Sequence, residues 1–141
     1  MLGLPGLALW RVGDPGNVGA LVRAVDALGP GFVALSPGCA DPTGPRSLRA
    51  SAGAVFRVPL LSFDEAPRPR VALVPRGGTP LDELELGERV TFVLGAEREG
   101  LPAAVVAGAD ATASIPQEPR MESLNVAAAG AIALYERRRR Q

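Results

Sequence analysis

The sequence predicts an α/β domain: a mainly parallel sheet flanked by helices. Short apolar runs alternate with helical segments along the whole chain, and most of these runs are continuously apolar. Strands of this kind are typical of a parallel sheet that is covered on both faces. The length of 141 residues and the apolar content of 47 % fit one domain, residues 1–141, without a linker or repeat.

The first strand and helix follow from the start of the chain. An apolar run at 6–12 is followed by an Asp-Pro-Gly turn and then by Asn17, which has the position of a helix N-cap. The predicted helix covers 18–28 and ends at a Gly-Pro pair. It is apolar almost all round, so we expect neighbours on more than one side. Arg23 and Asp26 in this helix have the i,i+3 spacing of an ion pair.

The middle of the chain predicts shorter elements. They are, in order, a strand, a Pro- and Gly-rich loop, a helix, a strand, a capping box and a strand, at 31–36, 37–45, 47–55, 56–60, 62–65 and 70–76. A Gly-Gly pair at 77–78 then favours a turn.

The last part of the chain predicts two strands and two helices. The strands cover 89–95 and 111–115, and a short helix opened by proline covers 102–107. The longest helix is expected at 123–138, where Ser123 and Asn125 can act as N-terminal caps. Four consecutive arginines close it; such a run is either solvated or in contact with nucleic acid.

The composition excludes several classes of site. The chain has no histidine and no lysine, so all 15 basic residues are arginines. This excludes a Ser-His-Asp triad, a P-loop lysine, a Schiff-base lysine and a histidine zinc site. A single cysteine, Cys39, excludes a thiolate metal cage and an internal disulfide. We therefore expect no metal site, and an enzyme of this composition must use arginine, carboxylates, tyrosine or cysteine.

Location and source follow from other features. No apolar run is long enough to span a membrane, and the N-terminus lacks the pattern of a signal peptide, so we expect a cytoplasmic protein. Only two asparagines and two glutamines occur, beside many arginines, glutamates and prolines. This bias fits a thermophile and fits a GC-rich genome equally well.

Three loops that follow apolar strands combine glycine or proline with isolated polar residues, at 14–19, 94–101 and 115–125. Ligands of open α/β sheets bind beyond the carboxyl ends of strands, so these loops favour a small-molecule or nucleotide pocket. Simple structural roles are open beside this: Asn17, Glu97 and Asn125 can be helix caps, Trp10 a core residue and Cys39 inert.

These segments carry a resemblance. DPGNVGALVRAVDALG, FVLGAEREGLP and IPQEPRMESLNVAAAGAIALYE resemble the three signature motifs of the SpoU (TrmH-like) branch of the SPOUT RNA methyltransferases. ASAGAVFRVPL resembles a further recurrent segment of that branch. The resemblance implies a deep C-terminal trefoil knot, a homodimer and S-adenosylmethionine as cofactor. It also implies methylation of a ribose 2′-hydroxyl in tRNA or rRNA.

The resemblance also assigns roles to residues. The expected catalytic group consists of Arg23, Asn17, Glu97, Ser123 and Asn125. The expected cofactor-binding residues are Leu94, Gly95, Ile115 and Leu124. Two positions depart from the family pattern: Gln117 stands where methionine is usual, and Pro119 where glycine is common. Both belong to the loop expected over the cofactor, so they put cofactor affinity in question.

Arg23 is expected to act as a cation. Neutralising an arginine with a pKa near ~13 at pH 7 costs roughly 8 kcal/mol, which disfavours a role as general base. A cationic guanidinium would instead stabilise a developing alkoxide or steer a phosphate. The chain begins close to its first strand, so we expect no separate N-terminal RNA-binding domain. The alternatives are a degenerate, non-catalytic domain that binds RNA or protein, and an unrelated nucleotide-binding module, which would lack its usual glycine fingerprint.

Overall fold

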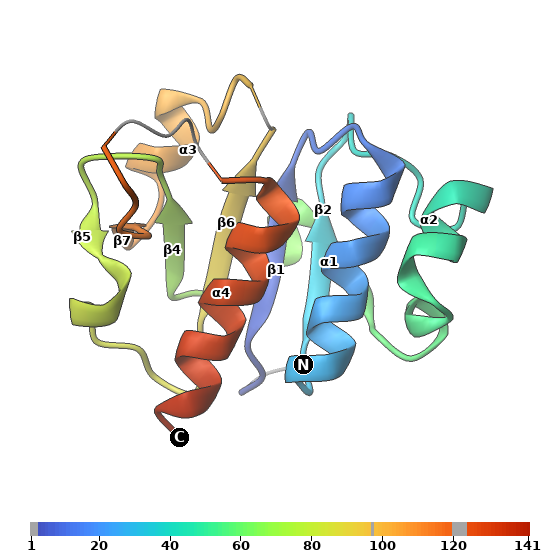
Figure 1. Ribbon diagram of the computed structural model, residues 1–141, viewed down its shortest axis with the longest axis horizontal. Helices are drawn as coiled ribbons and strands as arrows, with labels where there is room; N and C mark the ends of the chain where they lie inside the picture. The colour runs from blue at the N-terminus through green and yellow to red at the C-terminus, as the bar shows by residue number, and fades with distance from the viewer. Residues whose placement is uncertain (1–2, 97, 120–123) are drawn as a thin grey trace.

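The structure is a computed structural model, and it describes residues 3–96, 98–119 and 124–141. A seven-stranded sheet forms its centre, with the strand order β3-β2-β1-β6-β4-β7-β5. Every pairing between these strands is parallel. Figure 1 shows α1 and α4 side by side on one face of the sheet, with α2 beside α1 and α3 on the other face. The predicted parallel α/β architecture is confirmed.

The elements have the following bounds. The strands are β1 (Gly6–Trp10), β2 (Phe32–Leu35), β3 (Leu60–Ser62), β4 (Arg70–Leu73), β5 (Thr79–Pro80), β6 (Thr91–Gly95) and β7 (Ala111–Ser114). The α-helices are α1 (Pro15–Leu28), α2 (Pro45–Ser51), α3 (Ala103–Ala107) and α4 (Val126–Arg139). Three short 3₁₀ turns are η1 (Ala54–Phe56), η2 (Phe63–Glu65) and η3 (Leu81–Glu83).

The sheet is buried on both faces. Alternate residues of β1 belong to two different apolar clusters: Leu7 and Leu9 to the larger one, and Ala8 to the smaller one. The larger cluster lies beneath α1 and α4, and the smaller one contains Phe63, whose ring meets Trp10 edge-on at 5.1 Å. A strand buried on both sides needs apolar residues at every position, which explains the continuous runs in the sequence.

Helix α1 begins differently from the prediction. Its N-cap is Asp14, whose carboxylate accepts the N–H of Gly16 at 2.8 Å. Asn17 lies inside the first turn, so the prediction that it caps this helix was wrong. The reason is Pro15, which starts the helix at its own position because it needs no hydrogen-bond acceptor there. The predicted cover on several sides is confirmed, since α1 packs against α2, α4 and the sheet.

The predicted ion pair between Arg23 and Asp26 is absent from the described contacts. Asp26 instead binds Arg57, with 2.7 Å between the carboxylate and the guanidinium. Helix α2 covers most of the segment predicted as helix at 47–55. Arg57 follows η1, which occupies the end of that segment and the start of the strand predicted at 56–60. That strand was misplaced, because N–H groups of this segment bond back to the carbonyls of Gly53 and Ala54. The strand, β3, begins only at Leu60.

The C-terminal arginines are part of α4 and bind the rest of the fold. Arg138 donates to the carbonyl of Gly29 at 2.8 Å. Arg140 donates to the carbonyl of Leu81 at 2.8 Å and also to that of Leu84. A free, solvated tail is therefore the wrong description of this run, because Arg138 and Arg140 donate to backbone carbonyls of other segments.

Candidate functional site

A pocket of about 270 Å³ lies where β4, β6 and β7 end and α4 begins. Because the strands are parallel, their carboxyl ends lie together at one end of the sheet, as Figure 1 shows. Residues at or after the end of each strand supply most of the wall, and the first turns of α4 close it. The lining includes Leu73, Val74, Pro75, Leu94, Gly95, Ala96, Ile115, Gln117, Leu124, Val126 and Ala129. Most of the lining side chains are apolar, and Arg98, Glu99 and Gln117 add polar side chains.

The four residues predicted to bind a cofactor all line this pocket: Leu94, Gly95, Ile115 and Leu124. Leu94 and Gly95 end β6, Ile115 directly follows β7, and Leu124 lies two residues before α4. Gln117, one of the two departures from the family pattern, also lines it, whereas Pro119 is exposed and is not part of the wall. The lining therefore includes one of the two departures, Gln117.

Gly95 has a specific steric role in this pocket. A Cβ atom at this position would lie 2.5 Å from the carbonyl carbon of Gly100 and 2.7 Å from the N atom of Leu101. The loop after β6 therefore crosses directly over Gly95. It is closed by the N–H of Gly100, which donates to the carbonyl of Ala96 at 2.8 Å. Only glycine allows two backbones to approach this closely.

The two asparagines of the chain meet beside the pocket. Asn125 Nδ2 donates to Asn17 Oδ1 at 3.2 Å, across 108 positions of sequence. Asn125 Oδ1 accepts the N–H groups of Ala127 at 2.8 Å and Ala128 at 3.2 Å. Asn125 is therefore the N-cap of α4, as predicted, and it also connects α4 to α1. Because it stands between Leu124 and Val126, which line the pocket, the pair lies at its margin.

The other predicted catalytic residues are placed differently. Arg23 is exposed on α1 and is not among the residues that line the pocket. Glu97 and Ser123 lie outside the described residues. The structure thus brings together Asn17, Asn125 and the four pocket residues, and it leaves Arg23 on the open surface of α1.

Sequence analysis missed the wall formed by Leu73, Val74 and Pro75. This segment consists of the last residue of β4 and the two residues after it, and it carries no polar side chain that would indicate a site. A usable signal was present, however: a strand that ends at proline ahead of a Gly-Gly pair. Such a chain must leave the sheet at the edge where ligands bind.

Two carboxylates away from the pocket have lowered pKa values because of neighbouring arginines. The N–H of Arg70 and the guanidinium of Arg68 lower the pKa of Asp110. The guanidinium of Arg57 lowers the pKa of Asp26. Arg98 and Glu99 are the charged residues of the pocket wall.

Among the described residues, no three histidine, cysteine or carboxylate side chains gather as a metal site would require. No helix in the described part of the chain is long and apolar enough to cross a bilayer.

Comparison with known proteins gives a consistent result. The SpoU rRNA Methylase family matches residues 6–135. The 23S rRNA (guanosine(2553)-2'-O)-methyltransferase RlmP of Bacillus subtilis is 33 % identical over 141 residues, which cover 94 % of this chain and 57 % of that protein. The chain spans about half the length of the curated relatives that it matches.

Solved structures agree in fold. An rRNA methyltransferase from Sinorhizobium meliloti with bound AdoMet has a TM-score of 0.89 at 34 % identity, over 96 % of this chain and 56 % of that one. A protein studied for 2-OH methylation of C/U34 on tRNA has a TM-score of 0.85 at 30 % identity. That alignment covers 96 % of this chain and 94 % of the other.

Proposed function

The chain belongs to the SpoU rRNA Methylase family, and we propose that it transfers a methyl group from S-adenosylmethionine to a ribose 2′-hydroxyl of tRNA or rRNA. One observation carries this proposal. Leu94, Gly95, Ile115 and Leu124, which the motifs assign to the cofactor, line a single pocket beside the Asn17–Asn125 pair. The relatives named above act on rRNA or tRNA, which supports RNA as the substrate class.

The pocket suits this cofactor. Its apolar walls, with leucine, isoleucine and valine side chains, can sandwich a planar adenine ring, and its size is close to the lower bound of about 300 Å³ for ligand sites. Gly100 and Leu101 approach Gly95 closely and belong to the pocket wall, where their main-chain groups can hydrogen-bond to a ligand. When bound, S-adenosylmethionine supplies an electrophilic methyl group on a positively charged sulfur.

The chain's own residues must handle the hydroxyl. With no histidine available, we propose that Arg23 remains a cation and stabilises the oxygen as its negative charge develops. Asn17 and Asn125 orient the ribose or its phosphate through amide groups, and the proton passes to solvent. Glu97 and Ser123 are proposed to complete this group. A rate that is flat between about pH 7 and 9 would contradict an alkoxide formed before methyl transfer.

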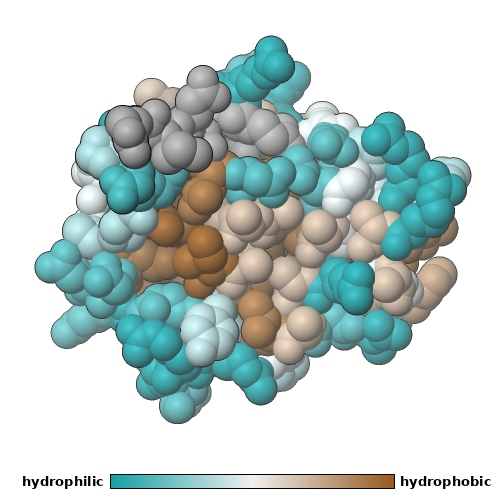
Figure 2. Space-filling model, viewed as in Figure 1, coloured by the Kyte–Doolittle hydropathy of each residue, from teal (hydrophilic) through white to brown (hydrophobic). Residues whose placement is uncertain are grey.

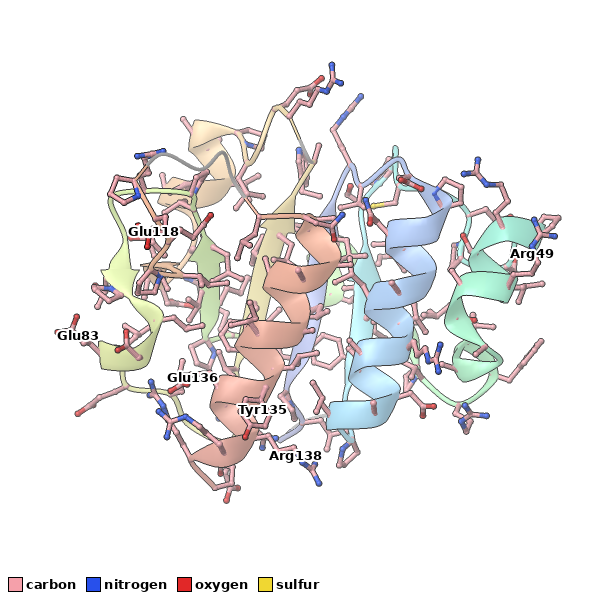
Figure 3. All side chains as sticks on the ribbon, in the orientation of Figure 1. Arg49, Glu83, Glu118, Tyr135, Glu136 and Arg138 are labelled. Carbon is pink, nitrogen blue, oxygen red and sulfur yellow. The ribbon has the colours of Figure 1, made fainter. Side chains whose placement is uncertain are left out.

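The position of Arg23 favours a homodimer. Arg23 is exposed and does not line the pocket of its own chain, so we propose that it reaches the pocket of the partner protomer. Helix α4 supports this arrangement, because Ile132 and Tyr135 are 40 % and 58 % exposed. Figure 2 shows apolar residues gathered across the face formed by α4 and its neighbours, and Figure 3 shows Tyr135 on α4 at this face. A monomer by light scattering at micromolar concentration would contradict the dimer.

We also propose the trefoil knot. β7 lies between β4 and β5 in the sheet, although β4 and β5 both precede it in the sequence. This order supports a path in which the chain after β6 passes within the loop 70–95 before it returns as α4. Optical-tweezer extension from both ends tests this, because a knotted chain stops short of its full contour length, roughly 3.6 Å per residue.

Two further proposals concern the setting of the protein. We propose a cytoplasmic location, where tRNA and rRNA are found. A thermophilic source and a GC-rich genome both fit the composition; an unfolding midpoint above the range of about 45–65 °C that is usual for mesophiles would select the first.

Calorimetric titration with S-adenosylhomocysteine, followed by methyl transfer into RNA, tests the function. We expect one micromolar site per chain, and labelled methyl groups on ribose 2′-oxygens after nuclease digestion. Arg23→Ala should lose methyl transfer at least 100-fold and keep its affinity for S-adenosylhomocysteine. Binding without transfer to any RNA would favour the non-catalytic alternative, and the absence of binding would overturn the proposal.

A further inference from the structure

Arg11 lies at the end of the sheet formed by the carboxyl ends of the strands, where the pocket also lies. It follows β1 directly, and Trp10, the last residue of that strand, pairs in register with Gly95. Arg11 is therefore a near neighbour of the pocket loop on one side. On the other side its N–H donates to Ser36 at the end of β2. None of the motifs discussed above assigns a role to Arg11.

The backbone of Arg11 has an unusual conformation. Its φ is 53°, in the left-handed region that residues other than glycine and asparagine rarely adopt. In the described part of the chain the other such residue is Ala52, which terminates α2 through an N–H bond to the carbonyl of Arg49. Arg11 ends a strand instead, where glycine would fit without strain. An arginine at this position needs a reason that lies in its side chain.

A buried network holds Arg11 in this conformation. Ser36, 5 % exposed, accepts the N–H of Arg11 at 2.8 Å and donates to the carbonyl of Pro37 at 2.9 Å. The Cys39 thiol donates to the carbonyl of Leu9 at 3.4 Å and so fixes the loop against β1. The stem of Arg11 lies across Gly38, where a Cβ atom would be 3.3 Å from its Cγ. The side chain is thereby supported along one side.

The guanidinium at the end of this support is open to solvent. Arg11 is exposed, and no carboxylate of the described residues forms an ion pair with it. Arginines that do form ion pairs in the described residues, such as Arg57, bind a carboxylate elsewhere in the chain, here that of Asp26. A cation that is held in place but unpaired is ready to bind an external anion.

We infer that Arg11 binds a phosphate of the RNA substrate next to the methylated nucleotide, an inference that rests on the proposed function. The guanidinium group matches phosphate oxygens in pairs, and such contacts position RNA without reading its sequence. The position fits, because Arg11 lies at the pocket edge near the loop after β6, while Asn17 lies at the start of the helix that follows. The strained backbone then serves to aim the side chain.

Substitution separates this role from a structural one. Arg11→Gly relieves the strain, Arg11→Gln removes the charge, and Arg11→Lys keeps it. The control is Arg89→Gln, because Arg89 is exposed and lies two residues before β6, at the opposite end of the strands from the pocket. Each protein is titrated into a labelled, mixed-sequence 15-nucleotide RNA and into unfractionated tRNA, from 50 to 200 mM salt, with S-adenosylhomocysteine affinity and unfolding midpoint measured in parallel.

We expect Arg11→Gly and Arg11→Gln to weaken binding of both RNAs by about 3- to 10-fold and to lower the salt slope by about 1. Arg11→Lys should lie between them and the wild type, and Arg89→Gln should match the wild type. The affinity for S-adenosylhomocysteine should not change, and Arg11→Gly should unfold at the same or a higher temperature.

Three results would overturn the inference. Wild-type RNA affinity and salt slope in Arg11→Gly and Arg11→Gln would do so while leaving the proposed function intact. An equal loss in Arg89→Gln would show a general charge effect, and a lower unfolding midpoint in Arg11→Gly would show a structural role. Wild-type protein that binds neither RNA nor S-adenosylhomocysteine would instead remove the proposed function itself.

Discussion

Alanine at Gly95 should damage the pocket through a single added methyl group. The Cβ atom would lie 2.5 Å from the backbone of Gly100, about 0.9 Å inside ordinary contact at 3.4 Å. Neither side can yield by a rotamer change, because both atoms belong to the main chain. The loop 96–101 must therefore move outward, and overpacking of this kind costs about 1–3 kcal/mol.

Two measurements check this. The unfolding midpoint should fall by roughly 3–5 °C per kcal/mol in a chain of this length. Titration with S-adenosylhomocysteine should show a Kd at least ten times that of the wild type, because the displaced loop forms part of the pocket wall. Gly87→Ala is the matched control, since the nearest atoms to its Cβ are 4.0 Å away. Wild-type affinity and midpoint in Gly95→Ala would refute the steric argument.

Three further predictions concern α4. Asn125→Asp should keep the cap and the stability but lose its donor to Asn17, so activity should fall while the midpoint stays; Asn125→Ala should also lose about 1 kcal/mol in urea unfolding. Arg140→Ala should lower the unfolding free energy by about 1–3 kcal/mol, because the carbonyls of Leu81 and Leu84 and the carboxylate of Glu136 each lose a guanidinium donor. Exposed Arg139→Ala should change it by less than about 1 kcal/mol, and equal effects of the two variants would contradict this. The hydrogen bond from Arg139, with a second from Arg140, lowers the pKa of Glu136 below its ordinary value, so this contribution to stability is present above that value and is lost as the pH falls below it. Melting curves of wild type and Glu136→Gln between about pH 3 and 7 check the sign, since the variant should show a weaker acid dependence.

Local chemistry made part of the fold predictable. Strands buried on both faces need apolar residues at every position, so β1, β2 and β6 were recognisable from sequence. Asn125 was predictable as the cap of α4 because its side chain bonds to N–H groups only two and three positions away. Local bonds of this kind depend little on the rest of the chain.

Competition between neighbours was harder to predict. Asp14 and Asn17 are both good caps, and the position of Pro15 decided in favour of Asp14. Asp26 has an arginine three residues before it in the same helix, yet it binds Arg57 from a different segment. The C-terminal arginines are indistinguishable from a solvated tail until the carbonyls of Gly29, Leu81 and Leu84 are placed beside them.

By itself, the sequence determined the class of fold, the excluded chemistries and the pocket residues that its motifs single out. The absence of histidine and lysine excludes sites that need these residues, whatever the fold. Burial on both faces requires an apolar sequence in each strand separately, so this pattern is visible without the tertiary structure. Only the tertiary structure decided that β6 lies between β1 and β4, and β7 between β4 and β5. That order joins Asn17 to Asn125, builds a pocket wall from the featureless segment 73–75, and leaves Arg23 outside it. These are contacts between segments 20 to 108 positions apart, and their energies depend on how whole elements pack.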